Sequence, residues 1–340
     1  EIMAGGLPAL SGATGTLDFD SKYCITIRST SYAHWISYNG KMVIIDYYSR
    51  DSGGHSSSPV AAWEWKKQHK QDVDGTGNEI DYPELKDNYA VLVAASEGWK
   101  NYRHQADVLG FYHYLKGEGY DDDHIILIMA DDIAYNERNP LQGVVRREVS
   151  GNNLYEDVVI DYKLGDISLG DLKQILTSEP SDAYPVTLGS SKSDNVLFFW
   201  SGHGTQNGWK WKETENLNAD FAKSVFSDMQ FRKMFAIIET CYSGGVAQGC
   251  IGIPGLLMMT AANPYETSKA DAFDSELQVY LSNTFTSSIL SQFETNPNSI
   301  IYDLYLHAFN KTNGSHVMVY NPDYYGNLYL NDMSEYYPNK

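Results

Sequence analysis

The pattern of hydrophobic positions in this chain changes near residue 85. Upstream, residues 15–29, 34–40 and 41–49 are short stretches rich in β-branched and aromatic residues, and Asn-Gly and Gly-Gly turns separate them. This pattern is typical of antiparallel strands. Residues 1–84 are therefore predicted to form a small β-rich extension at the N-terminus.

Downstream of residue 85, apolar runs alternate with segments of helical periodicity. Uninterrupted runs of this length are typical of strands buried on both faces, and five occur, at residues 89–95, 125–130, 195–200, 234–239 and 255–261. Helices are predicted over residues 103–117, after Ser168 as N-cap, and from about Ser275 to Phe293. Strand and helix in alternation predict an α/β fold over residues 85–340, with a mostly parallel sheet flanked by helices on both faces.

Composition and charge narrow the function classes. A chain of 340 residues with 42% hydrophobic positions can bury a large core. No apolar run reaches the roughly 18 residues that a transmembrane helix needs. The formal net charge of -19 argues against a nucleic-acid partner, because phosphate binding needs clustered Lys and Arg.

The cysteines do not identify a redox compartment. Cys24, Cys241 and Cys250 are too few for a disulfide framework, and none of them has the spacing of a zinc ligand pair. Asn310 and Asn313 each begin a glycosylation-type tripeptide, which is compatible with export. Together with the acidic, Tyr-rich composition, this favours an extracytoplasmic location, whether secreted, periplasmic or lysosome-like.

Candidate catalytic residues follow the third and fourth apolar runs. His203 lies in "SGHG" and Cys241 in "ETCYSGG". In a parallel sheet the carboxyl ends of the strands share one edge, where ligands bind. If these two strands are neighbours, the imidazole lies within reach of the thiol, as a cysteine nucleophile requires.

The glycines beside these residues add a second requirement of acyl transfer. Gly204 allows its backbone N–H to approach a reacting carbonyl, and the N–H of Cys241 is the natural second donor of an oxyanion hole. One such donor contributes about 3 kcal/mol in the transition state. A single Cys or His is more often structural, but the two together, each beside glycine, favour catalysis.

Several motifs together resemble the legumain, or asparaginyl endopeptidase, family, whose members are related to caspases. They span about residues 87–321 and include "SEGWKNYRHQAD", "MADDIAYNERNPLQG", "SGHG", "RKMFAIIETCYSG", "TAANPYETS" and "SHVMVY". The resemblance implies a caspase-like fold in which Cys241 is the nucleophile and His203 the acid and base, with no cofactor needed for catalysis. It also implies that Asn101 orients the imidazole.

The same resemblance implies a substrate specificity. The family cleaves after Asn, and more weakly after Asp, through a pocket that carries both signs of charge. Arg103 matches the basic member and Glu239 the acidic member. An asparagine side chain suits this pair, because Arg103 can donate to its carbonyl oxygen while Glu239 accepts from its NH2 group. His104, Thr267 and Ser268 are expected to line the same pocket.

One pocket position departs from the family. Where members commonly carry a second aspartate, this chain has Asn283. The loss of that carboxylate reduces the negative charge of the pocket. We therefore expect Asn to remain the preferred P1 residue, with weaker discrimination against Asp at neutral pH.

An acidic loop at residues 72–84 resembles a calcium site of the EF-hand kind. The candidate ligands are Asp72, Asp74, Thr76, Asp81 and Glu84, although Glu84 comes one residue too late for the usual spacing. The alternative interpretation is a solvated turn rich in Asp and Gly. A calcium-binding module without catalysis is accordingly the rival function class.

Two further alternatives share the Cys and His pair. If an amine reaches the thioester before water, the same site ligates peptides instead of cleaving them. The transamidase that attaches lipid anchors is a second relative, and it ranks behind because the pocket motifs differ more and no membrane segment is evident. Because the family is often made as inactive precursors, residues 1–84 are also a candidate autoinhibitory segment.

Overall fold

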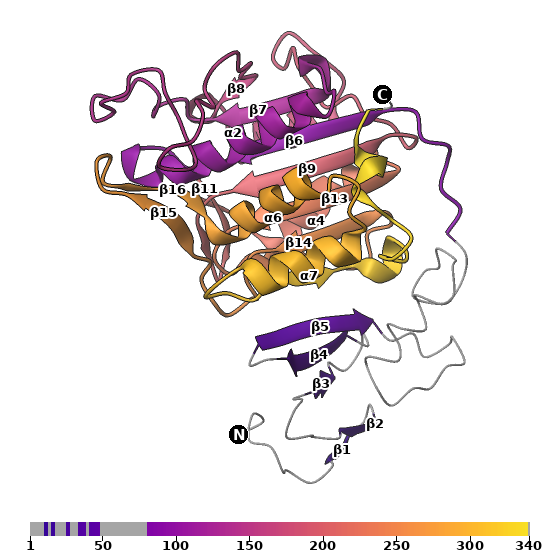
Figure 1. Cartoon of the computed structure of the whole chain (residues 1–340). Helices are drawn as coiled ribbons and strands as arrows, with labels where there is room; N and C mark the ends of the chain where they lie inside the picture. The colour runs from indigo at the N-terminus through magenta and orange to yellow at the C-terminus, as the bar shows by residue number, and fades with distance from the viewer. Residues whose placement is uncertain are drawn as a thin grey trace.

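The computed structural model describes residues 80–338 and, within the preceding part, the backbone of five short strands (Figure 1). These are β1 Leu10–Gly12, β2 Gly15–Leu17, β3 Ile25–Ile27, β4 Ala33–Tyr38 and β5 Lys41–Tyr47. β1 pairs with β2, and β3, β4 and β5 form a second sheet, with all pairings antiparallel. The antiparallel strands predicted here are confirmed, while the domain boundary at residue 84 stays a prediction.

A seven-stranded sheet forms the centre of the described region, in the order β17-β14-β13-β9-β6-β7-β8. Its pairings are parallel except for β17 against β14. All five predicted strands belong to it. The strands are β6 Asn88–Ala94, β7 Ile125–Met129, β8 Tyr162–Lys163, β9 Asn195–Ser201, β13 Lys233–Glu239, β14 Leu256–Thr260 and β17 Met318–Tyr320.

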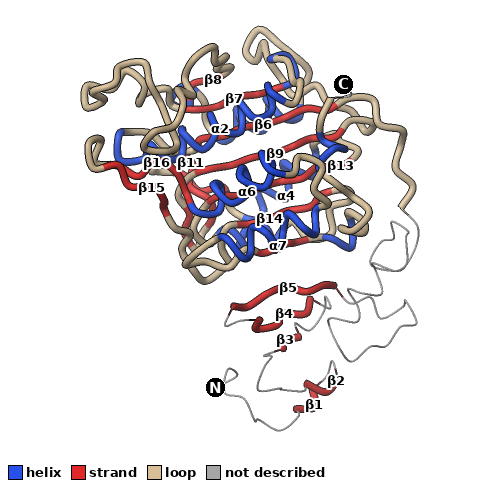
Figure 2. The backbone as a smooth tube through the Cα atoms, in the orientation of Figure 1, coloured by secondary structure: helices blue, strands red, loops and turns tan. Residues whose placement is uncertain are grey.

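Helices cover both faces of this sheet, as predicted (Figure 2). Alternate residues of each strand face opposite sides, so Leu92 joins one hydrophobic core and Val91 the other. The first core contains the buried faces of α2 Tyr102–Gly117, α6 Thr284–Thr295 and α7 Ile301–Lys311. The second contains those of α3 Leu169–Thr177, α4 Ala219–Asp228 and α5 Ser243–Gly249. The α/β fold class is therefore confirmed.

Shorter elements connect these layers. Two small antiparallel sheets contain β10 Gly204–Thr205, β11 Gly208–Trp211 and β12 Glu215–Leu217, and β15 Ala270–Asp274 and β16 Val279–Asn283. The 3-10 helices are η1 Trp99–Asn101, η2 Asp122–His124, η3 Leu164–Asp166, η4 Pro322–Tyr324 and η5 Met333–Tyr336. In Figure 1 the arrows of β6 and β9 point toward the side where β11, β15 and β16 lie.

The predicted helix from Ser275 to Phe293 is wrong in its first half. α6 begins only at Thr284, and the preceding residues form β16, whose side chains alternate between buried and exposed up to Leu281. The Asp274 carboxylate accepts hydrogen bonds from the N–H groups of Glu276 and Leu277, which stabilises a turn. In contrast, the N-cap at Ser168 is confirmed, with a complete capping box to Asp171.

Candidate active site

The strands that carry the candidate residues end at one level. In the sheet register, Ser201 of β9 pairs with Ala94 of β6 on one side and with Glu239 of β13 on the other. The third and fourth predicted strands are thus neighbours, as the pairing of His203 with Cys241 requires. The segments that leave β6, β9 and β13 all start from this carboxyl edge.

The loops after β9 and β13 are in direct backbone contact. The N–H of Gly202 donates to the carbonyl oxygen of Glu239 at 3.1 Å. A Cβ built on Gly204 would collide with the carbonyl oxygen of Cys241. Only glycine fits at position 204. Because it has no side chain, the segments that contain His203 and Cys241 can lie in contact.

His203 is held by a carboxamide in a defined orientation. Its Nε2 lies 2.8 Å from Oδ1 of Asn101, whose own NH2 group donates to the carbonyl oxygen of Glu97 at 2.7 Å. Because the NH2 group is used by Glu97, Oδ1 is an acceptor and Nε2 carries the proton, an assignment made from the hydrogen bonds. Nδ1 of His203 is then the basic nitrogen of the ring.

Burial keeps this imidazole neutral. It lowers the pKa of His203, and the positive charge of Arg103 adds to the effect, while Glu213 opposes it. His104 packs edge-on against His203 with ring centroids 4.9 Å apart. Burial also lowers the pKa of His104 well below 6.5, and its Nδ1 lies 2.5 Å from Oγ of Ser96. His104 therefore supports the His203 ring from a fully buried position.

Cys241 sits in the turn between β13 and α5. It is half-buried, and its Sγ lies 3.9 Å from Oγ of Ser268. The next residue, Tyr242, has a left-handed backbone with φ 54°, which is uncommon for a residue other than glycine. The N–H of Tyr242 donates to the carbonyl oxygen of Glu266 at 2.8 Å. This bond holds the turn against the segment that contains Thr267 and Ser268.

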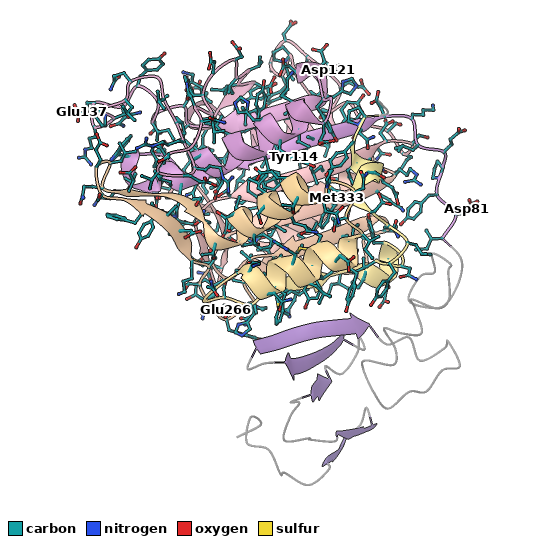
Figure 3. All side chains as sticks on the ribbon, viewed as in Figure 1. Asp81, Tyr114, Asp121, Glu137, Glu266 and Met333 are labelled. Carbon is teal, nitrogen blue, oxygen red and sulfur yellow. The ribbon has the colours of Figure 1, made fainter. Side chains whose placement is uncertain are left out.

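Glu266 anchors that segment on its other side. Its carboxylate accepts from the backbone N–H of His316 at 2.7 Å and lies 2.7 Å from Nδ1 of the same residue. These contacts lower the pKa of Glu266 against the opposing effect of burial. Figure 3 shows Glu266 at the lower left of the described domain. Thr267 and Ser268, both half-buried, follow directly, and Ser268 contacts Cys241.

Beside these residues lies a buried polar cluster, which we define as Arg103, Asp107, Glu239 and Asn283. Nε of Arg103 donates to Oδ1 of Asn283 at 3.1 Å, and Nδ2 of Asn283 donates to Oδ2 of Asp107 at 2.6 Å. Burial lowers the pKa of Arg103, while the charges of Asp107 and Glu239 oppose this. The cluster thus contains one guanidinium, two carboxyl groups and one carboxamide.

Glu239 has one oxygen engaged and one without a bond. Its Oε2 accepts from the N–H and the Oγ1 of Thr286, both at 3.2 Å. Its Oε1 is buried and makes no hydrogen bond of good geometry within residues 80–338, although Ser268 lies close enough to lower the pKa of the carboxyl. Burial raises the pKa of Glu239 to about 8, and the charge of Asp107 adds to this. A ligand that donates a hydrogen bond to Oε1 would favour the ionised carboxylate and lower this pKa.

Asp107 is the member of the cluster that the sequence reasoning missed. It lies four residues after Arg103 on α2, so the two side chains share one face of the helix. Its side chain is fully buried. The i, i+4 spacing to a proposed pocket residue was the available signal, but a helix face alone does not say which element covers it.

The calcium loop falls largely outside the described residues, which is the case for Asp72, Asp74 and Thr76. Asp81 and Glu84 are exposed, and Figure 3 places Asp81 on the opposite side of the domain from Glu266. Within residues 80–338, no three His, Cys, Asp or Glu side chains are grouped so that they could hold a metal ion. Calcium binding stays a prediction. None of the helices in this part of the chain is long and apolar enough to cross a membrane.

Comparison with known proteins supports the motif-based resemblance. The chain is 33% identical over 214 residues to a Caenorhabditis elegans protein provisionally named GPI-anchor transamidase, which covers 61% of this chain and 67% of that one. It is 29% identical over 242 residues to human legumain, which covers 68% of this chain and 56% of legumain. Sequence identity thus does not favour legumain over the transamidase.

A solved structure and a family match complete the comparison. Caspase-1 from Spodoptera frugiperda superposes with a TM-score of 0.41 at 11% identity, which covers 71% of this chain and 88% of the caspase. Residues 88–335 match the Peptidase C13 family, which includes most of the described region. On this match the chain belongs to the Peptidase C13 family of peptidases.

Proposed function

We propose that this protein is a cysteine endopeptidase that cleaves peptide bonds after asparagine, and more weakly after aspartate. The observation that carries the proposal is the polar cluster beside Cys241. In it, Oε1 of Glu239 is buried without a hydrogen bond of good geometry, and Arg103 binds Asn283 through Nε alone, which leaves terminal guanidinium N–H groups to donate to a ligand. An asparagine carboxamide complements both groups. Its oxygen accepts from Arg103, and its NH2 group donates to Oε1 of Glu239.

The proposed chemistry is acyl transfer through a thioester. Sγ of Cys241 attacks the main-chain carbonyl carbon of the P1 asparagine while Nδ1 of His203 takes the thiol proton. The N–H groups of Gly204 and Cys241 stabilise the oxyanion. When the C–N bond breaks, His203 returns the proton to the leaving amine. Water then attacks the thioester with His203 as base, which releases the acid and restores the thiol.

Asn101 acts on this reaction through His203. Its bond to Nε2 fixes the tautomer that leaves Nδ1 basic. The lowered pKa of His203 keeps that nitrogen unprotonated into mildly acidic solution. We therefore expect a mildly acidic pH optimum. From the pair of Arg103 and Glu239 we expect peptide or protein substrates with Asn at P1.

Turnover of an Ala-Ala-Asn fluorogenic peptide tests this function. We expect Cys241→Ala to lower kcat by at least about 10³-fold, since the covalent step is lost. Cys250 is the matched control: it is buried, and burial raises the pKa of its thiol to about 12, so Cys250→Ala should keep turnover. A preference for basic or aromatic P1 residues in a peptide library would contradict the assignment of Arg103 and Glu239.

Transfer to an amine is the second candidate, favoured by the similarity to the transamidase-named relative. Water and an amine compete for the same thioester, so the two reactions share every residue named above. Incubation of the asparaginyl peptide with an added amine, followed by mass spectrometry, separates them. Hydrolysis gives the N-terminal fragment as a free acid. Transfer gives the same fragment as an amide, which is heavier than the free acid by the mass of the amine less one water.

A further inference from the structure

The loop after β7 contains the motif "MADDIAYNERNPLQG", to which the proposed mechanism assigns no role. β7 pairs with β6 in parallel, so the segments that follow these two strands leave the same edge of the sheet. The two segments meet at the half-buried Asp132, whose Oδ2 accepts from the N–H of Gly98 at 2.6 Å. The segment after β6 also contains Asn101, which holds His203.

The peptide unit between Glu97 and Gly98 joins Asp132 to Asn101. Its carbonyl oxygen accepts from Nδ2 of Asn101 at 2.7 Å, and its N–H is the group that donates to Asp132. The two groups of a trans peptide point in opposite directions, so this unit is bonded on both sides. Gly98 has a φ of 86°, a backbone conformation that favours glycine. The peptide is thereby held between a carboxylate and a carboxamide.

These groups form a hydrogen-bond relay, which we define as His203, Asn101, the peptide unit 97–98 and Asp132. Nε2 of His203 donates to Asn101, the Asn101 NH2 group donates to the peptide oxygen, and the peptide N–H donates to Asp132. A carboxylate only accepts, so it can only end such a relay. Its negative charge polarises each bond in turn and favours positive charge on the imidazole.

Gln105 fixes the orientation of the Asp132 carboxylate. It is fully buried on α2, and its Nε2 donates to Oδ1 of Asp132 at 2.6 Å. Its Oε1 accepts from the backbone N–H of Asp131 at 3.1 Å, so only one orientation of the carboxamide makes both bonds. Each oxygen of Asp132 is therefore matched to a donor, one from Gln105 and one from Gly98.

The other titratable groups around His203 belong to α2, to β11 and the turn after it, and to the turn after β13: Arg103, His104, Lys210, Glu213 and the proposed nucleophile Cys241. Burial lowers the pKa of His203, the cations Arg103 and Lys210 lower it further, and Glu213 opposes them. His104 carries no charge, because burial lowers its pKa well below 6.5. The net effect of these groups disfavours the imidazolium, and the relay provides a carboxylate on its Nε2 side that favours it.

We propose that Asp132 is a positioning residue of this active site, which orients the Asn101 and His203 pair and stabilises the imidazolium through the peptide unit 97–98. The inference rests on the proposed function. When Nδ1 of His203 takes the thiol proton, the ring becomes a cation. The carboxylate at the end of the relay stabilises that charge without contact to the ring or the substrate.

The first test is Asp132→Asn, with kcat and KM for the Ala-Ala-Asn peptide measured between pH 4 and 8. The variant leaves one acceptor oxygen for two donors and removes the charge. We expect kcat to fall about tenfold with KM within twofold of wild type. The acidic limb of kcat/KM should move to lower pH by roughly half a unit, because a less stabilised imidazolium loses its proton more readily. A kcat within twofold of wild type, or an acidic limb that does not move, overturns the inference.

Asp131→Asn is the matched control. Its carboxylate contacts Nζ of Lys163 at 3.0 Å and the hydroxyl group of Tyr155 at 2.6 Å, and it is outside the relay. Asp131 has a φ of 58°, which asparagine tolerates. The control should keep the wild-type kcat and acidic limb. Equal losses in Asp131→Asn and Asp132→Asn overturn the inference.

A double-mutant cycle with Asn101→Ala tests the route of the effect. Without the Asn101 carboxamide, the peptide unit 97–98 no longer connects to His203. Adding Asp132→Asn to this background should therefore lower kcat by less than about twofold more. A fall as large as that in the wild-type background would show that Asp132 acts by another route, and the inference would be overturned.

The double variant Asp132→Asn/Gln105→Glu keeps the test decisive if Asp132→Asn does not fold. The carboxamide at position 132 can then accept from Gly98 and donate to the new carboxylate at position 105, which still accepts from the N–H of Asp131. The relay again ends on a carboxylate, so kcat should lie within about threefold of wild type. A folded double variant with kcat below this range overturns the inference.

Failure of the proposed function has a different signature. A wild-type protein that does not cleave the Ala-Ala-Asn peptide overturns the proposed function and this inference together. A wild-type protein that cleaves it, combined with an unchanged kcat in Asp132→Asn, overturns this inference alone.

Discussion

The two edges of the central sheet bury polar groups at matching positions, but these groups have different hydrogen-bond partners. At the amino edge, Asn88, Asn195 and Lys233 lie level on β6, β9 and β13. At the carboxyl edge, Ala94 and Glu239 lie level on either side of Ser201. Each row contains a buried ionisable group, Lys233 or Glu239, so burial by itself does not separate the two edges.

The amino edge is closed by the C-terminal segment. Asn88 donates to the carbonyl oxygen of Tyr337 at 2.9 Å, and Asn195 donates to that of Glu335 at 2.7 Å. Lys233 donates to Asn331 and, at 3.0 Å, to Glu335. These side chains bond to protein groups that are present in every molecule, which is what a structural role requires.

Each edge keeps a buried oxygen without a partner among residues 80–338, Oδ1 of Asn88 at the amino edge and Oε1 of Glu239 at the carboxyl edge. The pKa of the Glu239 carboxyl is about 8 because it is buried. A buried polar atom without a partner costs free energy. The comparison teaches that the two edges differ in what surrounds the unpartnered oxygen: Oε1 of Glu239 lies in the cluster with Arg103, whereas the Asn88 side chain is bonded to the C-terminal segment.

Gly204→Ala should have the largest effect at the carboxyl edge. The new methyl group would collide with the carbonyl oxygen of Cys241, which would move an oxyanion donor and separate the loops of His203 and Cys241. We expect kcat/KM to fall by about 10²-fold or more. Gly117→Ala is the matched control, because a Cβ there meets nothing within 4 Å; equal activity losses in the two variants would contradict the close contact.

Lys233→Met tests the amino edge. It removes the buried ammonium from Glu335, which keeps only the longer contact of 3.4 Å to Arg232, so we expect the free energy of unfolding to fall by about 2 kcal/mol. Activity per folded molecule should not change. Lys223→Met, at an exposed position on α4, should change stability by less than about 0.5 kcal/mol. Loss of specific activity in Lys233→Met would show that the two edges are coupled.

A third prediction concerns the pH dependence of stability. In the unfolded chain Glu239 titrates near 4.5, whereas in the folded protein its pKa is about 8. Between these values the folded state retains a proton that the unfolded state releases, so stability falls as pH rises. Asp107, with a pKa of about 6, acts in the same direction at lower pH.

Glu239→Gln isolates this contribution. The variant should show a shallower decrease of Tm between pH 5 and pH 8 than wild type, measured by thermal unfolding in matched buffers. Glu84→Gln, at an exposed position, should keep the wild-type slope. A wild-type slope in Glu239→Gln would mean that Glu239 does not retain its proton on folding.

Much of the fold followed from local patterns. The buried strands were evident because uninterrupted runs such as that ending in Glu239 have no polar face, and α3 was evident from the cap at Ser168. The hairpin before α6 was missed because its turn depends on the Asp274 carboxylate bonding to backbone N–H groups. A hydrogen bond from a side chain to the backbone leaves no trace in the periodic pattern of hydrophobic residues.

The candidate site was likewise predicted only in part from the sequence. His203 and Cys241 were predicted to face each other because strand ends of a parallel sheet share an edge; β9 and β13 are paired, and Gly204 leaves no room for a side chain beside Cys241. Asn283 was recognised as a departure from the family. Its bond to Asp107 was not, because these residues are 176 positions apart in the chain.

The sequence by itself determined the layered α/β fold, and it predicted a facing Cys241 and His203 and a pocket that contains Arg103 and Glu239, because each of these is encoded in residue type and local order. Only the tertiary structure decided which oxygen of Glu239 stays free and which carboxylate lies behind Arg103. Hydrogen-bond polarity depends on which groups meet across elements, and that is set by packing.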